Sequence, residues 1–117
     1  MDRILIRIDE FVTGHNGITP DEGEPIFSKI EDALKLGKKV EIDFSGVIMV
    51  TTAFLNVVIG KLYKDYTSEQ LKALLSFANL QPSSAVRIKK VTENAKLFYK
   101  DEKRYNDIVE RAANGDN

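Results

Sequence analysis

The stretch from Val40 to Asn56 constrains the fold of this chain more than any other part of the sequence. Its first half alternates apolar and charged residues up to Phe44, which is the pattern of a buried strand. Ser45-Gly46 then supplies a tight turn, and from about Thr52 the apolar residues cover most of a helix circumference. A buried strand followed so closely by an enclosed helix is typical of α/β proteins, in which helices cover a sheet.

The same periodicity predicts further strands and helices along the chain. We expect strands at residues 3–12, 39–44 and 74–80, and helices at residues 25–36, 52–66 and 82–100. A break near Asp101 precedes a last amphipathic helix with Tyr105, Ile108, Val109 and Ala112 on one face, and residues 114–117 should fray. The alternation of strand and helix predicts the α/β class. We expect a mixed β-sheet with both faces covered by α-helices, in a single domain spanning residues 1–117.

Prolines, glycines and apolar stripes give the expected helix boundaries and core. Pro25 places the regular part of the first helix near it, because an interior proline removes a backbone hydrogen bond. Gly60 inside the second helix indicates a close approach of a neighbouring element. Three sets of residues should be buried: Ile26, Ile30, Ala33 and Leu34; Phe44, Leu55, Val58 and Leu62; and Ile88, Val91, Ala95 and Phe98.

Charge and composition exclude several functional classes. The 17 basic and 18 acidic residues nearly cancel, so we expect neither a nucleic acid nor a membrane as partner. The charges are nevertheless uneven, since acidic residues gather between positions 9 and 32 and basic ones between 87 and 104. The chain has no cysteine, no signal-peptide pattern and no apolar run of membrane-spanning length, which leads us to expect a cytoplasmic protein.

Two motifs of the central stretch resemble a known family. Ile42-Asp43-Phe44-Ser45-Gly46-Val47, followed after three residues by Thr51-Thr52-Ala53-Phe54-Leu55, is similar to the signature of STAS domains, regulatory modules that include bacterial anti-sigma-factor antagonists. The closer resemblance is to a divergent STAS-like group of bacterial proteins, DUF4325. The resemblance implies a STAS-like fold and a non-enzymatic regulatory function through protein–protein interaction. It also implies a protein partner, for which a histidine-kinase-type ATPase is the expectation.

The resemblance also implies site residues. Thr52 falls where anti-sigma-factor antagonists carry their phosphoacceptor serine, Thr51 replaces an aspartate, and Phe54 replaces a glycine. The candidate partner-binding residues are therefore Thr51, Thr52, Phe54 and Asn56. The ring of Phe54 either shields the Thr52 hydroxyl or forms an apolar docking point. Thr52 itself has two compatible interpretations, a helix N-cap and a hydroxyl switched by phosphorylation.

Other chemistries have less support in the sequence. The alternative function is a small-ligand domain that binds a nucleotide or an anionic metabolite at the same helix N-terminus. His15 is a lone histidine in a glycine-flanked loop, and Asp43 is expected to accept hydrogen bonds around the Ser45-Gly46 turn. We therefore predict no catalytic residues, no metal site and no cofactor. The sequence does not indicate the oligomeric state.

Overall fold

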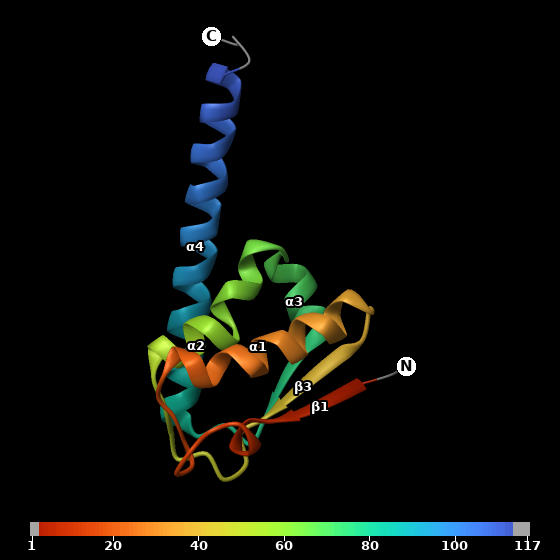
Figure 1. Cartoon of the computed structure of the whole chain (residues 1–117), viewed down its shortest axis with the longest axis vertical. Helices are drawn as coiled ribbons and strands as arrows, with labels where there is room; N and C mark the ends of the chain where they lie inside the picture. The colour runs from red at the N-terminus through yellow and green to blue at the C-terminus, as the bar shows by residue number, and fades with distance from the viewer. Residues whose placement is uncertain (1–2, 114–117) are drawn as a thin grey trace.

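The computed structural model describes the backbone of residues 3–113 and the side chains of residues 3–100. The elements, with η marking a 3-10 helix, are β1 (Arg3–Arg7), η1 (Ile8–Glu10), β2 (Asn16–Gly17), α1 (Pro20–Lys35), β3 (Lys39–Asp43), β4 (Met49–Val50), α2 (Thr52–Val58), η2 (Gly60–Lys64), α3 (Ser68–Leu74), β5 (Leu75–Ala78) and α4 (Pro82–Ala113). Figure 1 shows their arrangement.

The strands form two parallel sheets. The main sheet has the order β1-β3-β5, with Ile6 paired to Ile42 and Ile42 to Phe77. A second, two-stranded sheet joins β2 to β4, and an isolated antiparallel bridge joins Thr13 to Asn16. The α/β class is confirmed, with two sheets of parallel strands in place of one mixed sheet. The pairing is parallel because each helical crossover returns the chain to the end of the sheet from which the previous strand began.

Helices cover one face of the main sheet, and the other face is open. Ile6, Val40 and Ile42 point to the helix side and are at most 2% exposed. α1 packs on β1 and β3, and α3 packs on β3 and β5; in Figure 1 no ribbon lies on the opposite side of β1 and β3. On that side Leu5 is 54% exposed. The expectation of two covered faces is therefore wrong.

Three predicted boundaries were wrong for local reasons. β1 ends at Arg7 instead of residue 12, because the chain turns into η1 there. β5 starts at Leu75, because α3 runs through Leu74 from a capping box formed by Thr67 and Gln70. α1 starts at Pro20, five residues before Pro25. A capping box between Thr19 and Glu22 stabilises this start, and Pro25 removes only the bond to the carbonyl of exposed Asp21.

The second predicted helix, residues 52–66, is two helices. α2 ends at Val58, and the chain tightens into η2 from Gly60. Gly60 is buried beside α4, but a Cβ there would lie at ordinary contact distances, 3.6 Å from the Val91 side chain and 3.8 Å from Ala95, so this packing does not require glycine. The predicted core of Phe44, Leu55, Val58 and Leu62 is confirmed, with exposures of 0 to 3%. So is the buried face of α1, which is made by Ile26, Ile30, Ala33 and Leu34.

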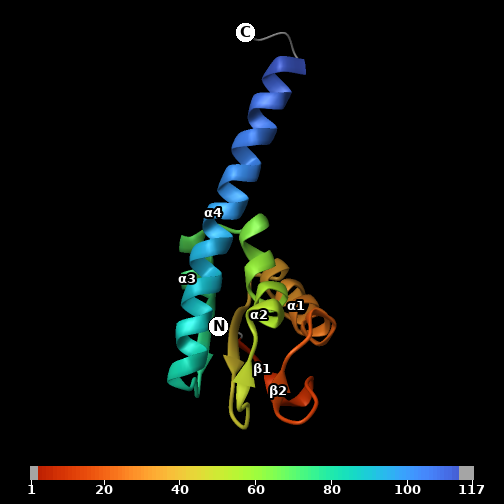
Figure 2. The ribbon, with the colours of Figure 1, turned by 90° about the vertical axis from the view of Figure 1, so that its left-hand side faces the viewer.

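α4 is one continuous helix, so the predicted break near Asp101 is wrong. Its predicted stripe is buried at Ile88, Val91 and Ala95, but Phe98 is 62% exposed. Figures 1 and 2 show that the later part of α4 leaves the other elements and runs on alone. The side chains of the predicted face at Tyr105, Ile108, Val109 and Ala112, and all of residues 114–117, lie outside the described residues. No helix among the described residues is long and apolar enough to cross a membrane.

Candidate functional site

The start of α2 is held in place by the small β2–β4 sheet. The backbone N–H of Ile48 donates to the carbonyl of His15 at 2.8 Å, and the N–H of Thr51 donates to the carbonyl of Gly17 at 2.9 Å. These bonds extend the pairing of β2 with β4 on both sides. The first turn of α2 is therefore fixed against the loop that leads into α1.

Thr51 is the N-cap of α2. Its backbone is extended, with φ −94° and ψ 161°, and its hydroxyl oxygen accepts the N–H of Phe54 at 3.1 Å. The same hydroxyl donates to the carbonyl of Ile18 at 2.6 Å. Its one proton is therefore engaged, and it ties α2 to the β2 side of the small sheet. The interpretation of Thr52 as the cap is wrong by one residue.

Thr52 is the first residue of α2 and is exposed. Its hydroxyl has no hydrogen-bond partner within the part of the chain that the structure describes. A hydroxyl at the first helical turn that solvent can reach agrees with the expectation for this residue. Thr52, unlike Thr51, can be modified without breaking a hydrogen bond of the fold.

Phe54 points into the core and does not form a docking point. It is fully buried, and a Cβ on Gly17 would lie only 2.7 Å from its ring. The ring thus packs flat against the backbone of β2. It neither covers the exposed Thr52 nor offers a surface to a partner.

Asn56 is exposed and one turn beyond Thr52, but it lies toward α4. It lines a hollow of about 310 Å³ together with Val57 and Gly60 of the same segment and with Asn94, Ala95, Phe98 and Tyr99 of α4. The structure therefore separates Asn56 from the small sheet.

Sequence reasoning missed three exposed apolar side chains in the segments that form the small sheet. Ile48 is 61% exposed, and Ile18 and Met49 are each 39% exposed. Ile18 directly follows β2, and its carbonyl accepts the Thr51 hydroxyl; Met49 lies in β4, and Ile48 directly precedes it at the other end of the small sheet. The sequence did carry a signal for this exposure. Ile48 and Met49 stand between the Ser45-Gly46 turn and the start of a helix, in a short connection where few side chains become buried. We call the surface of Ile18, Ile48, Met49 and Thr52 the β2–β4 face.

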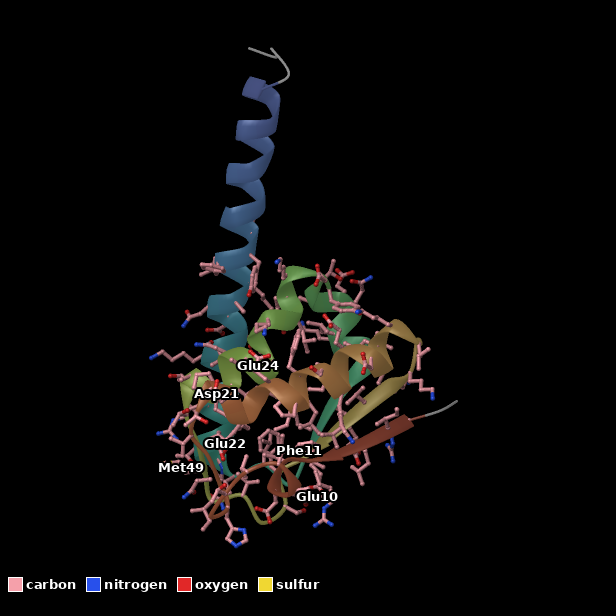
Figure 3. The ribbon with its side chains drawn as sticks, viewed as in Figure 1. Glu10, Phe11, Asp21, Glu22, Glu24 and Met49 are labelled. Atoms are coloured by element: carbon pink, nitrogen blue, oxygen red, sulfur yellow. The ribbon has the colours of Figure 1, made fainter. Side chains whose placement is uncertain are left out.

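Charges of opposite sign border the β2–β4 face. α1 begins three residues after β2 and brings Asp21, Glu22 and Glu24 beside it, and Figure 3 shows Met49 in the same region. The N–H groups of Thr13 and then Thr19 lower the pKa of the Glu22 carboxyl, and Glu24 pairs with Lys61 at 3.1 Å. On the α4 side, the guanidinium of Arg87 donates to the carbonyl of Val50 at 3.0 Å.

Asp43 has a structural role at the end of β3. Its carboxylate accepts the Asn79 amide at 2.9 Å, the Ser45 hydroxyl at 2.7 Å and the Ser45 N–H at 2.9 Å. The amide and the hydroxyl, followed by the N–H, lower the pKa of Asp43. The carboxylate therefore joins the end of β3 to the residue after β5, as expected for a residue that stabilises the turn.

His15 and Asp9 form a pair that the sequence did not indicate. The Nδ1 of His15 lies 2.9 Å from Oδ1 of Asp9, and the histidine side chain is 62% exposed. The pair brackets the loop before β2. Among the described residues, no group of three or more acidic or histidine side chains could hold a metal ion.

Comparisons with known proteins agree with this fold. A family model described as a STAS-like domain of unknown function (DUF4325) matches residues 22–85, from the first turn of α1 to the start of α4. The match includes β4, Thr51 and all of α2. Searches of curated proteins and of solved structures gave no match.

Proposed function

The chain belongs to the family of STAS-like domains of unknown function, and from this premise we propose that it is a non-enzymatic regulatory module that binds a protein partner through the β2–β4 face. The observation that carries the proposal is the exposure of Ile18, Ile48 and Met49, three apolar residues in or next to the short strands β2 and β4, together with the exposed hydroxyl of Thr52. Single exposed apolar residues are common, whereas several of them on one small hydrogen-bonded sheet favour an interaction surface.

The hollows described near α4 give no support to a small-ligand site at Thr51 and Thr52. Neither of the two hollows near α4 is lined by Thr51 or Thr52, whereas small ligands bind in concave sites. The N-terminus of α2 is also a weak anion site. The helix has only 7 residues, and the N–H of Phe54 is already bonded to Thr51.

The partner we propose is a histidine-kinase-type ATPase, which is the expectation from the family resemblance. The borders of the β2–β4 face support a charged protein partner, because acidic α1 residues lie on one side and Arg87 lies on the other. Such opposite borders fix the orientation of an approaching protein and raise its association rate.

The regulatory step we propose is phosphorylation of Thr52. A phosphate adds about −1.5 to −2 charges at pH 7, here on the same surface as the exposed apolar residues that we propose for the partner. The fold tolerates this charge, because Thr52 is exposed and opens a helix. An apolar contact with the partner would not tolerate it, since the phosphate would have to lose its water. Phosphorylation therefore releases the partner.

The test combines capture of the partner with a matched pair of surface variants. After the kinase-type partner has been captured from native cells and purified, calorimetry compares wild type with Ile48→Asp and with Leu36→Asp. Ile48 and Leu36 are 61% and 70% exposed, and Leu36 caps the far end of α1. We expect Ile48→Asp to weaken binding at least about tenfold and Leu36→Asp to leave it unchanged. Equal affinity of both variants and wild type would refute the proposed surface.

A second pair of variants tests the switch. Thr52→Glu should weaken the complex, and Thr52→Ala should leave it intact, with both variants folded. If Thr52→Glu binds as tightly as wild type, the β2–β4 face binds its partner without regulation at Thr52.

A further inference from the structure

α4 extends far beyond the elements on which it packs. Its 32 residues correspond to about 48 Å of helix. It contacts α2, η2 and β4, and its last buried residue among the described side chains is Ala95. In both Figure 1 and Figure 2 the remainder of α4 runs away from the other elements. The part of α4 beyond Ala95 is short for an isolated helix, and such a segment is only marginally stable in water without a packing partner.

The buried positions of α4 follow the spacing of a coiled coil. Ser84, Ile88, Val91 and Ala95 succeed one another at intervals of four, three and four residues, as positions a and d of a heptad do. The same register continues through Phe98, Glu102, Tyr105, Val109 and Ala112. With Glu102 as the exception, an apolar sequence stripe therefore continues along the projecting part of the helix.

The point where α4 leaves the other elements has room for a second helix. Phe98 lies in the stripe, yet it is 62% exposed. Two hollows of about 480 and 310 Å³ adjoin it, and both are lined by Lys61, Phe98 and Tyr99. The larger hollow also reaches Phe27 and Glu31 of α1. Side chains from a helix packed along α4 would enter these hollows.

We propose that two copies of this chain pair through the projecting parts of their α4 helices, in antiparallel orientation. The pair is centred between residues 102 and 105. Phe98 of each copy then packs in the same layer as Val109 of the other, and Glu102 lies in the same layer as Tyr105, whose hydroxyl can donate to a carboxylate. One surface patch used twice is the commonest interface of homodimers.

The charges of α4 favour a second copy and the antiparallel orientation. Residues 96–104 carry four basic and two acidic side chains, whereas residues 105–113 carry two acidic and one basic. An antiparallel pair sets each mainly basic segment beside a mainly acidic one. A parallel pair would set like segments together. The antiparallel orientation also opposes the two helix dipoles.

The oligomeric state of the full chain tests the proposal. Light scattering coupled to size exclusion, over a range of protein concentrations, should show a dimer for wild type and a monomer for Phe98→Asp. The control is Val86→Asp, which changes another apolar side chain of α4 that is 69% exposed but lies outside the stripe. It should remain dimeric, and circular dichroism should show both variants folded. A wild type that is monomeric throughout, or a Phe98→Asp variant as dimeric as wild type, would overturn the proposal.

Single cysteines test the orientation, since the chain has none of its own. In the antiparallel pair the two copies of residue 105 lie about 5 Å apart along the helix axis, and the two copies of residue 112 about 25 Å apart. Tyr105→Cys should therefore cross-link with a short bis-maleimide, and Ala112→Cys should not. Equal cross-linking at both positions would show a parallel pair and overturn the antiparallel assignment.

Discussion

At the scale of single residues, two adjacent threonines have different tasks. Thr51 both accepts and donates a hydrogen bond within the fold, whereas Thr52 faces solvent. The two side chains have the same chemistry, so the difference comes from backbone position alone. The cap must have an extended backbone, and Thr51 is the last residue before the helical turn.

This division predicts unequal costs for two alanine substitutions. Thr51→Ala should lower the free energy of unfolding by about 1–2 kcal/mol, because it removes the cap and the bond to Ile18. Thr52→Ala should change it by less than about 0.5 kcal/mol, since an exposed hydroxyl is lost. Urea titration of the two variants beside wild type measures both. Equal losses would show that Thr52 shares the capping role.

Asp43 gives a prediction for the dependence of stability on pH. Hydrogen bonds from Asn79 and Ser45 hold the pKa of its carboxyl below the ordinary value in the folded chain. The carboxylate therefore contributes its full stabilisation above the unfolded-state pKa of about 3.9 and loses it as the pH falls through the folded-state pKa. Wild type should lose more stability between about pH 6 and pH 3 than Asp43→Asn does.

The comparison with Asp43→Asn isolates this residue. The pKa of Glu22 is also lowered and contributes loss in the same direction, but both proteins retain Glu22. Urea titrations of the two proteins at each pH supply the measurement. Parallel pH profiles would mean that the hydrogen bonds to Asp43 do not favour its charged form.

At the scale of elements, periodicity predicted the positions of most helices and strands but not their ends. The alternation of apolar and charged residues in β3 and the apolar stripe of α1 were sufficient to locate these two elements, because each element has one buried face. The break between α2 and η2 was not visible, since 3-10 and α turns place apolar residues on similar faces. Gly60, where η2 begins, lies beside Val91 and Ala95 of α4.

The contact between Gly17 of β2 and Phe54 of α2 also depends on the folded structure. From the family resemblance we expected the ring of Phe54 either to shield the Thr52 hydroxyl or to form an apolar docking point. In the structure the ring instead packs against Gly17 of the facing strand.

This contact predicts a coupled pair of substitutions. Gly17→Ala should destabilise by about 1–3 kcal/mol, because its Cβ would lie 2.7 Å from the ring of Phe54. Phe54→Leu removes the atoms responsible for the clash, so Gly17→Ala should cost less in that background. A double-mutant cycle in urea measures the coupling. Additive losses would show that the loop before α1 moves away from the ring at no cost.

At the scale of the whole molecule, the sequence predicted the order of elements and the α/β class. It did not predict that helices cover only one face of the main sheet. Arg3, Leu5 and Arg7 alternate with half-buried Ile4 and buried Ile6. A parallel sheet normally has helices on both faces, so we expected helices on the second face as well. The length of α4 was missed for a similar reason. Asp101 and Glu102 interrupt the apolar pattern without interrupting a helix that has left the other elements.

The open face predicts how the sheet responds to charge on its two sides. Leu5 and Ile6 are neighbours in β1, with exposures of 54% and 2%. Leu5→Lys should change the free energy of unfolding by less than about 1 kcal/mol, because the lysine enters water. It joins a face that already carries the pair of Arg3 and Glu41 at 3.5 Å. Ile6→Lys should unfold the protein or cost more than about 4 kcal/mol, because it buries an unpaired charge under α1.

The pair of substitutions distinguishes a two-layer molecule from a three-layer one. Both replace an aliphatic side chain by the same lysine, one residue apart in the same strand, so β-propensity and net charge change alike. Only the side of the sheet differs. Urea titration and the helical circular dichroism signal of the two variants give the answer. If Leu5→Lys were as damaging as Ile6→Lys, some segment would have to cover the second face. The sheet would then be the middle layer of the molecule instead of its outer one.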